Sequence, residues 1–434
     1  MKIVFLTGGT GSYYCGACMR DNALAQEIQR AGHDVTLAPM YLPLMLDEAT
    51  LAGADRVPVF FGGINVFLQQ KIPLFRHTPR WFDRLFNSTG LLKWAARHSH
   101  MTSAREHGAM ALEMLRVDSG LFRKELDKLM EWLAVIERPD VVCLSNALLA
   151  GFAVELKRRL RTPVVTFFQG EDTFLDGLPE PYRTDCWRAL HHRIRDSDLL
   201  LAPTRFYADF IGQRLQLPAA AIHVVPNGIR LDGYAPAAAP PAIPAIGYLA
   251  RLNEAKGLSH LVEAFIALAR DHADSTTRLR LAGTATAGDA PGLAAAREKI
   301  AAAGLTDRVD WLPNLSRDEK ISFLRSLSLL SVPVQYPEAF GLYIIEAMAC
   351  GVPVVQPDSA AFPELIAATG GGVTVEPRNP AALARTWHTL LADPARLAAL
   401  SHSARAGTLA HFSSATMATQ FLRTIAPLVP ARTT

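Results

Sequence analysis

The sequence predicts an α/β protein with two Rossmann-like, doubly wound domains that face a cleft. Three observations support this fold class. Short β-branched runs alternate with helical patterns over most of the chain, these runs are mainly apolar, and a Pro/Ala-rich stretch lies near the middle. Continuous apolar strands separated by helices are typical of parallel sheets that are covered on both faces.

The predicted strands form two sets, one in each half of the chain. In the first half we expect strands at 2–6, 35–38, 141–144, 164–168, 199–202 and 223–225. In the second half we expect them at 246–249, 279–282, 309–312, 329–334, 352–355 and 373–375. Ligands of open parallel sheets bind at the carboxyl ends of the strands, so functional residues are expected in the loops that follow them.

The domain limits follow from these two sets and from the stretch between them. Residues 1–233 are predicted to form an N-terminal Rossmann-like domain with an insertion at about 42–136. Residues 234–244 are predicted as a linker, because their prolines remove hydrogen-bond donors and fix the backbone. Residues 245–410 would form the C-terminal Rossmann-like domain, and 411–434 a C-terminal helix for which packing back onto the N-terminal domain is one option.

Composition excludes several classes of protein. Half of the 434 residues are hydrophobic, a fifth are charged and the formal net charge is +3, which is typical of a globular protein and not of a disordered one. Basic and acidic residues are balanced in both halves, which argues against a nucleic-acid partner. The five cysteines are scattered, and no run approaches about 20 apolar residues. We therefore expect a cytoplasmic protein.

Residues 67–97 break the α/β pattern, because basic and aromatic residues are interleaved there with Asp83 as the single acid. One interpretation is an insertion that packs its aromatic rings and exposes its charges. The other is an interfacial patch that contacts anionic lipid or an amphiphilic acceptor, which would place the protein peripherally at the inner membrane face. The residues of this patch include Lys71, Phe75, Arg76, Arg80, Trp81, Phe82, Arg84, Phe86, Lys93, Trp94 and Arg97.

The segment 337–353 is the most informative part of the chain. A strand leads into a short loop and then into a helix that is predicted to begin near Gly341 and to end at Gly351. The free N–H groups at such a helix start favour a phosphate. Glu338 lies just before the helix. Glu346 lies within it on an apolar face, so its carboxylate needs a partner, either sugar hydroxyls or an arginine elsewhere.

A second strand–loop–helix unit, at 246–257, carries Arg251 and Lys256 in its loop. A guanidinium and an ammonium at the end of a strand can bind a diphosphate and stabilise the charge that develops on it as it departs. Taken alone, the two residues do not favour a diphosphate site over ordinary solvated loop charges.

Together, the two segments resemble the family-4 retaining glycosyltransferases of the GT-B fold. The resemblance is carried by Glu338 and Glu346 with seven residues between them, and by the Arg251–Lys256 loop at the matching offset. It implies that Arg251 and Lys256 hold the donor diphosphate, that Glu338 binds hydroxyls of the transferred sugar and that Glu346 binds the ribose. It further implies that backbone amides approach the phosphate and sugar from Phe340, Gly341 and Leu342. The same resemblance implies that residues 1–233 bind the acceptor and that residues 245–410 bind the nucleotide sugar.

The first strand ends in a glycine-rich loop that contains Gly9, Gly11 and Ser12. One interpretation is an acceptor or nucleotide-sugar loop, because glycines let the backbone approach phosphates closely. The other is a dinucleotide fingerprint, which would need a glycine where Tyr14 stands. The neighbouring pair Cys15 and Cys18 has redox spacing, but small-residue packing or lining of an acceptor pocket is the favoured interpretation.

Another loop, after the strand at 164–168, contains Gln169, Glu171 and Asp172. Many members of the family have a histidine near this point, and here Gln169 takes its place. Glu171 or Asp172 could orient the acceptor hydroxyl or take its proton; capping of the next segment is the alternative. The Asp196-Ser-Asp198 sequence precedes a strand, so it is interpreted as solvated or capping, and no metal is expected.

The sequence therefore predicts a retaining glycosyltransferase that moves a hexosyl group from a nucleoside-diphosphate sugar, with a UDP-sugar favoured. The acceptor would be the hydroxyl of a lipid, a saccharide or another molecule. Arg251, Lys256 and Glu338 are the predicted catalytic residues, without a cofactor or metal. The alternatives are a non-catalytic sugar-nucleotide binding protein and a sugar-nucleotide epimerase on the same scaffold. The oligomeric state is left open.

Overall fold

The fold consists of two compact α/β units, seen in a computed structural model that describes residues 1–9, 16–44, 46, 48–54, 57–61, 104–117, 122–272 and 275–429. The first unit comprises residues 1–203, 207–225 and 417–434, and the second comprises 204–206 and 226–416. Apart from residues 204–206, the second unit begins at Pro226, and the Pro/Ala-rich stretch 234–244 belongs to it, where the ring of Tyr234 is buried. The patch 67–97 lies outside the described residues, as do Gly11, Ser12 and Cys15.

The first unit is built on a six-stranded parallel sheet in the order β2-β1-β3-β4-β5-β6. Its strands are β1 (Lys2–Thr7), β2 (Asp34–Pro39), β3 (Val141–Leu144), β4 (Val164–Phe167), β5 (Leu199–Ala202) and β6 (Ile222–Val224). Its main helices are α1 (Gly16–Arg30), α5 (Ala104–Leu115), α6 (Arg123–Trp132), α7 (Phe152–Leu160), α8 (Glu171–Asp176), α9 (Tyr182–Arg193), most of α10 (Arg205–Arg214) and most of α18 (Ser414–Ile425).

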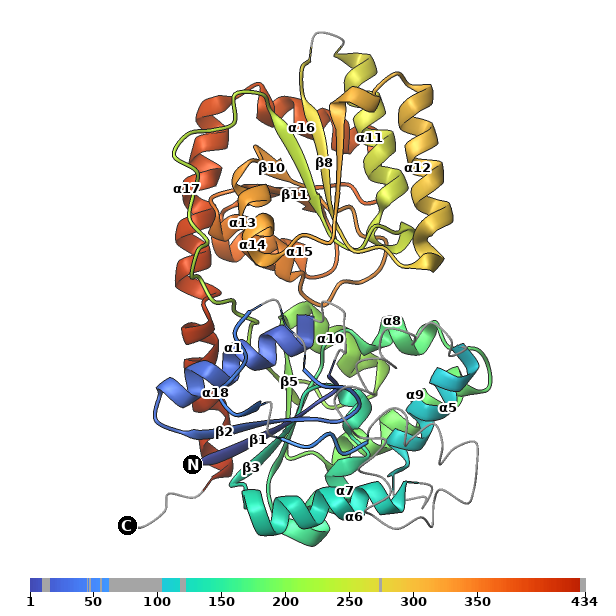
Figure 1. The fold of residues 1–434 in the computed structure, drawn as a ribbon, viewed down its shortest axis with the longest axis vertical. Helices are drawn as coiled ribbons and strands as arrows, with labels where there is room; N and C mark the ends of the chain where they lie inside the picture. The colour runs from blue at the N-terminus through green and yellow to red at the C-terminus, as the bar shows by residue number, and fades with distance from the viewer. Residues whose placement is uncertain are drawn as a thin grey trace. The chain divides into compact units, whose positions relative to one another are not determined.

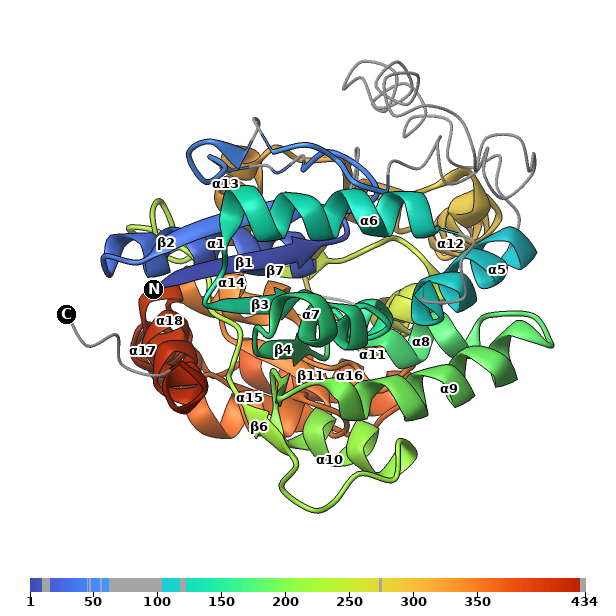
Figure 2. The same ribbon diagram turned by 90° about the horizontal axis from the view of Figure 1, so that it is seen from below.

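Both faces of this sheet are covered, as the alternation within β1 shows. Val4 and Leu6 belong to the core beneath α6 and α7, whereas Ile3 and Phe5 belong to the core formed with α1 and α18. Figure 2 shows this unit with α6 and α7 along the sheet. The ring of Phe421 in α18 lies 5.9 Å from that of Phe5, so the last helix completes the core of the first sheet.

The second unit has its own six-stranded parallel sheet, in the order β12-β11-β10-β7-β8-β9. Figure 1 labels β8, β10 and β11 of this sheet. Its strands are β7 (Ala245–Leu249), β8 (Arg278–Gly283), β9 (Val309–Pro313), β10 (Leu329–Leu330), β11 (Val354–Pro357) and β12 (Gly372–Val375). Its helices are α11 (Leu258–Asp271), α12 (Ala290–Ala302), α13 (Arg317–Arg325), α14 (Leu342–Ala349), α15 (Phe362–Thr369), α16 (Pro380–Leu391) and α17 (Pro394–His411). Short 3₁₀ turns such as η8 (Glu254–Lys256) and η9 (Ala287–Asp289) join them.

The predicted fold class and strand positions are confirmed, with one correction. The strand expected at 329–334 is only two residues long, Leu329–Leu330. Pro333 has no N–H to donate to a ladder, so the chain leaves the sheet early and forms a long loop before α14. This early exit places residues 331–341 beside the loop that follows β7, because β10 and β7 are neighbours in the sheet.

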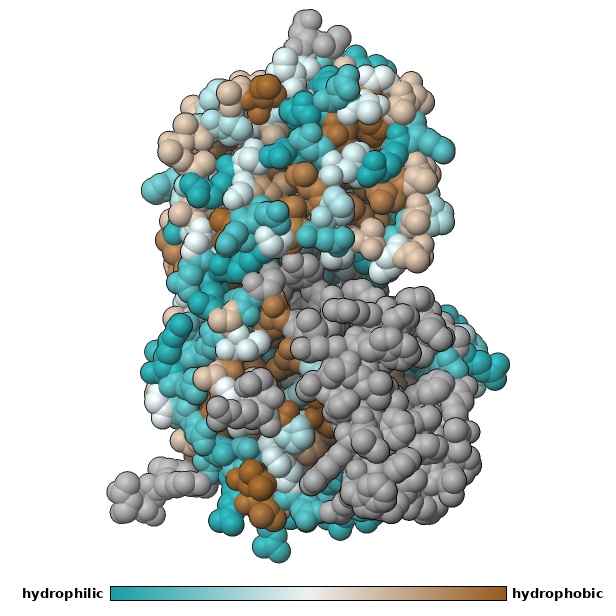
Figure 3. Space-filling view, in the orientation of Figure 1, coloured by the Kyte–Doolittle hydropathy of each residue, from teal (hydrophilic) through white to brown (hydrophobic). Residues whose placement is uncertain are grey.

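The surface of the described helices is of the ordinary mixed kind. On the face of the second unit seen in Figure 3, hydrophilic and hydrophobic residues are interspersed. Among the helices that the structure describes, none combines the length and the apolar character needed to cross a bilayer.

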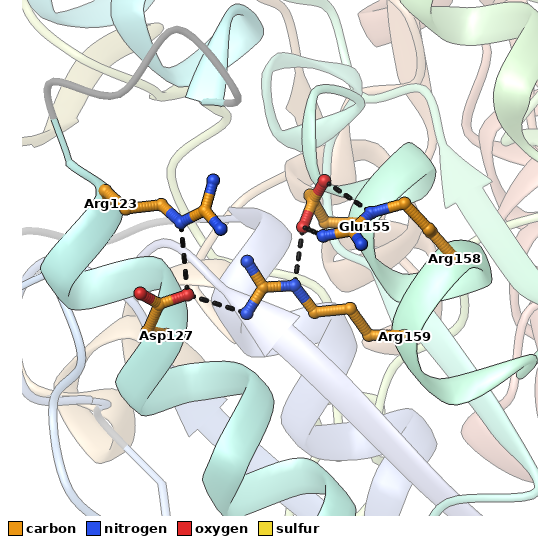
Figure 4. A network of polar contacts seen from close by, with 5 residues as sticks. All are labelled: Arg123, Asp127, Glu155, Arg158 and Arg159. Atoms are coloured by element: carbon orange, nitrogen blue, oxygen red, sulfur yellow. Dashed lines mark hydrogen bonds and ion pairs between the residues drawn. The ribbon is translucent and has the colours of Figure 1, made fainter.

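An ion-pair network joins α6 to α7 in the first unit (Figure 4). Arg159 donates to Asp127 and to Glu155 over 2.6 Å in each case, and Arg158 donates to Glu155 over 2.7 and 3.0 Å. Arg123 approaches Asp127 at 3.3 Å. Hydrogen bonds and charge from Arg158 and Arg159 outweigh burial and lower the pKa of Glu155.

This network predicts a pH-dependent contribution to stability. A carboxylate whose folded pKa is lowered stabilises the fold above its unfolded pKa, and that contribution is lost as the pH falls through the folded value. Replacing Glu155→Gln should therefore lower Tm by a few degrees at pH 7, and the difference from wild type should shrink below about pH 4.5. Thermal unfolding followed by circular dichroism between pH 3 and 7 measures this; a difference that stays constant across that range contradicts it.

Candidate functional site

The loop after β7 positions Arg251 through three local contacts. Tyr248 donates its hydroxyl to the Arg251 carbonyl over 2.7 Å, which fixes the backbone. The guanidinium donates through Nε to Asp289 and through Nη2 to Thr286, both over 2.9 Å. Burial disfavours the charged form of Asp289, but hydrogen bonds from Thr286 and Arg251 outweigh it and lower its pKa. The Arg251 side chain remains 49% exposed, so part of its donor fork is available to a ligand.

Close backbone packing brings the Lys256 loop to the residues that follow β10. Gly257 has φ of +78°, and a Cβ at this position would lie 1.9 Å from the carbonyl oxygen of Pro333. The Gln335 N–H donates to the Ala255 carbonyl over 2.9 Å. Only glycine fits such an approach, so the two loops meet as a consequence of the sequence.

The side chains of Lys256 and Glu338 form an ion pair across these two loops. Tyr336 donates its hydroxyl to the same carboxylate oxygen, Oε2, over 3.1 Å. The Lys256 ammonium also lies 5.0 Å from the centre of the Tyr336 ring. Lys256 and Glu338 are 18% and 15% exposed, so both are largely shielded from water and still reachable. A cation in such a place interacts more strongly with an anion than one on an open surface.

Helix α14 starts beside this pair. Its N-cap is Gly341 with φ of +91°, and no side chain caps the first turn. Phe340 is buried, and Leu342 begins the helix. The helix start therefore presents backbone N–H groups and a partial positive charge next to Glu338. The structure thus brings Lys256, Glu338 and the 340–342 segment together, while Arg251 lies on the Lys256 loop with its guanidinium held at η9.

Glu346 has a different set of neighbours, one turn further along α14. Its Oε1 accepts hydrogen bonds from Lys320 over 2.8 Å and from Tyr234 over 2.9 Å. Lys320 and Glu346 are 9% and 8% exposed. The carboxylate has thus found a lysine where the sequence suggested either sugar hydroxyls or an arginine.

The Lys320–Glu346 pair gives a stability prediction. Removing one partner of a buried ion pair typically costs about 3 kcal/mol, because the other charge stays buried. Lys320→Met should therefore lower Tm clearly, and adding Glu346→Gln in the same chain should recover part of the loss. Thermal unfolding of the two variants measures this. A Tm of Lys320→Met equal to that of wild type, or no recovery in the double variant, contradicts it.

In the first unit, the described site candidates make structural contacts. Gly9 has φ of +75°, and a Cβ there would lie 1.8 Å from the Leu42 carbonyl oxygen, so this glycine is required for packing. Glu171 accepts from the backbone N–H groups of Ala147, Gln169 and Gly170 over 2.8 to 3.1 Å. Burial raises its pKa.

Asp172 is also buried, and its carboxylate accepts from the Tyr207 hydroxyl over 2.6 Å. Burial raises the pKa of Asp172. Glu171 therefore joins the loops after β3 and β4, and no side chain that the structure describes caps α8. A role for Glu171 or Asp172 toward an acceptor stays a prediction. Asp198 makes a structural contact: its Oδ2 accepts from the Val164 N–H over 2.9 Å at the start of β4.

Sequence reasoning missed several residues around the site, namely Thr286, Asp289, Lys320, Tyr336 and Tyr343. Thr286 and Asp289 carry a recognisable signal, because a threonine followed three residues later by an acid is typical of a helix start. Cys18 is buried, and its Sγ lies 3.7 Å from the hydroxyl oxygen of Thr7. Among the described residues, no group of three or more His, Cys, Asp or Glu side chains could hold a metal ion.

Comparison with known families identifies both halves of the chain. Residues 111–232 match the model described as Glycosyltransferase Family 4, and residues 238–407 match the model described as Glycosyl transferases group 1. The chain is 31% identical over 231 residues to the D-inositol 3-phosphate glycosyltransferase of Salinispora tropica, covering 49% of this chain and 47% of that protein. It is 28% identical to the glycogen synthase of Mycobacterium tuberculosis, over 72% of each. The chain spans about half the length of the inositol-phosphate enzymes that it matches.

Solved structures share the whole fold at low sequence identity. The Anabaena protein HepE, solved in complex with UDP, superposes with a TM-score of 0.68 at 18% identity, over 98% of this chain and 100% of that one. The sucrose-phosphate synthase of Thermosynechococcus elongatus gives a TM-score of 0.68 at 17% identity, over 98% of both chains. With the two family models spanning most of residues 111–407 and two parallel sheets of the matching architecture, the chain belongs to the family-4 glycosyltransferases of the GT-B fold.

Proposed function

We propose that this protein is a retaining, metal-independent glycosyltransferase that moves a hexosyl group from a nucleoside-diphosphate sugar to a hydroxyl acceptor. The observation that carries the proposal is the Lys256–Glu338 pair at the start of α14, with Arg251 on the adjoining loop. A cation and a helix start can hold a diphosphate, and the carboxylate beside them can hold sugar hydroxyls.

In the proposed reaction the bond between the anomeric carbon and the diphosphate oxygen breaks, and a bond to the acceptor oxygen forms on the same face of the sugar. The acceptor proton passes to an oxygen of the leaving diphosphate. Lys256, Arg251 and the N–H groups at the start of α14 stabilise the negative charge that develops there. When the donor binds, the Lys256 ammonium contacts its phosphate in place of part of its contact with Glu338. The Glu338 carboxylate then accepts hydrogen bonds from the sugar hydroxyls.

We favour UDP as the nucleotide, because the structural neighbour HepE was solved with UDP and with UDP-glucose. The names of two relatives contain inositol 3-phosphate and glycogen, and both of these compounds carry hydroxyl groups. We therefore keep the acceptor as a hydroxyl compound, with a lipid or a saccharide as the first candidates.

A thermal-shift screen of UDP-, GDP- and ADP-hexoses tests the donor first. A ligand at 100 times its dissociation constant adds about 2.7 kcal/mol of stability, which is readily seen as a higher Tm. The selected donor is then incubated with an acceptor panel, with and without EDTA, and the anomeric configuration of the product is read by NMR. Transfer with retention in EDTA is the expected result. Binding without transfer or hydrolysis would indicate a sugar-nucleotide binding protein, and an epimerised donor would indicate an epimerase.

A further inference from the structure

Tyr343, the second residue of α14, has a buried hydroxyl for which the fold supplies no partner. Its side chain is 9% exposed, and its Oη makes no hydrogen bond with any residue that the structure describes. Leaving a buried polar group unpaired typically costs about 1–3 kcal/mol. Such a group in the middle of a candidate site indicates an interaction that is completed only when a ligand binds.

The hydroxyl is directed at the start of α14. A Cβ added to Gly341 would lie 3.4 Å from Oη, so only a hydrogen separates the tyrosine from the backbone that is expected to approach the phosphate. The Lys256 ammonium lies 5.5 Å from the centre of the Tyr343 ring. Burial, and then the nearby Glu338 and Tyr336, raise the pKa of Tyr343, so the hydroxyl stays protonated and can donate.

The neighbouring tyrosines differ from Tyr343 in this respect. Tyr248 donates to the Arg251 carbonyl over 2.7 Å, and Tyr336 donates to Glu338 over 3.1 Å. Glu338 is itself paired with Lys256 and belongs to the same cluster. Each of these side chains therefore has an intramolecular partner, and the Tyr343 hydroxyl is the donor that remains to be satisfied.

We propose that Tyr343 is a donor-binding residue whose hydroxyl donates to a diphosphate oxygen of the nucleotide sugar. An anionic oxygen fits because the Lys256 ammonium and the start of α14 both favour negative charge at this place. The proposal rests on the proposed function and adds a side-chain contact to the backbone amides of residues 340–342. It also explains why a polar side chain occupies a buried position in the otherwise apolar first turn of α14.

Tyr343→Phe separates a binding role from a structural one, because it removes only the hydroxyl. In the absence of ligand we expect an unchanged or higher Tm, since an unpaired buried group is lost. Isothermal titration with UDP should give a dissociation constant at least about tenfold higher than that of wild type, equivalent to about 1.4 kcal/mol. Tyr207→Phe is the matched stability control: its buried hydroxyl donates to Asp172 over 2.6 Å, so its Tm should fall.

The titrations with UDP and with a UDP-hexose distinguish the outcomes. Equal UDP affinity of Tyr343→Phe and wild type would overturn the proposal, even if UDP-hexose binding were weakened, because the contact would then be to the sugar. A large drop in the Tm of ligand-free Tyr343→Phe would also overturn it, because the hydroxyl would then be used within the fold. If wild type itself bound no nucleotide or nucleotide sugar, the proposed function would fail. That result is distinct from a difference in UDP affinity between wild type and Tyr343→Phe.

Discussion

Replacement of Lys256 by alanine is expected to lower kcat/KM for glycosyl transfer at least about 100-fold, because it removes a donor to the departing diphosphate. The ammonium is 18% exposed and held beside α14, so its charge acts in a partly shielded place. Initial-rate kinetics with the donor identified by thermal shift measure the effect.

The matched control for this variant is Lys299→Ala. Lys299 lies in the same unit and also forms an ion pair, with Glu263 over 2.7 Å, but that pair is exposed at 48% and 46%. Its kcat/KM should stay close to wild type, because an exposed pair contributes little. Near-wild-type turnover by purified, folded Lys256→Ala would remove the proposed mechanism.

Glu338→Ala is expected to lower kcat/KM by a similar factor, at least about 100-fold, through loss of the acceptor for sugar hydroxyls. Because Glu338 and Lys256 contact each other, their effects should not add. The Lys256→Ala/Glu338→Ala double variant should therefore be less impaired than the product of the two single effects. Strict multiplication of the two losses would show that the ion pair does not link the residues in catalysis.

A second readout tells which ligand group each residue serves. Titration with UDP alone should be weakened by Lys256→Ala and much less by Glu338→Ala, since only the first acts on the diphosphate. Glu263→Gln, at the exposed carboxylate that pairs with Lys299, is the control for the carboxylate variant. A Glu338→Ala protein with unchanged kcat/KM would contradict the assigned role.

Much of the fold could be predicted from the sequence, because buried parallel strands consist of mainly apolar residues in continuous runs. The runs at Val141–Leu144 and Val164–Phe167 became central strands of the first sheet. The apolar run at 329–334 predicts a longer strand than the two residues that pair, because apolar character alone does not show where pairing ends and Pro333 has no N–H to donate.

The parts of the site that depend on neighbouring residues in the sequence could be predicted. The parts that depend on contacts between residues far apart in the sequence could not. The helix start at Gly341 and the positions of Arg251 and Lys256 after β7 follow from glycines and strand ends nearby. The partners of Glu346 lie 26 and 112 residues away in the chain, so no local pattern could name them. The unpaired hydroxyl of Tyr343 is likewise a property of packing, since it depends on which groups fail to reach it.

The packing of α18 into the first sheet has a consequence for biosynthesis. The Phe421 ring stacks at 5.8 Å on Phe167 and contacts Phe5, yet it is translated after the whole of the second unit. On the ribosome, the face of the first sheet that carries Phe5 and Phe167 therefore waits, apolar and incompletely covered, until the last helix emerges. The first sheet should thus engage chaperones for longer than its position near the N-terminus suggests. The second unit should be the first of the two to finish folding.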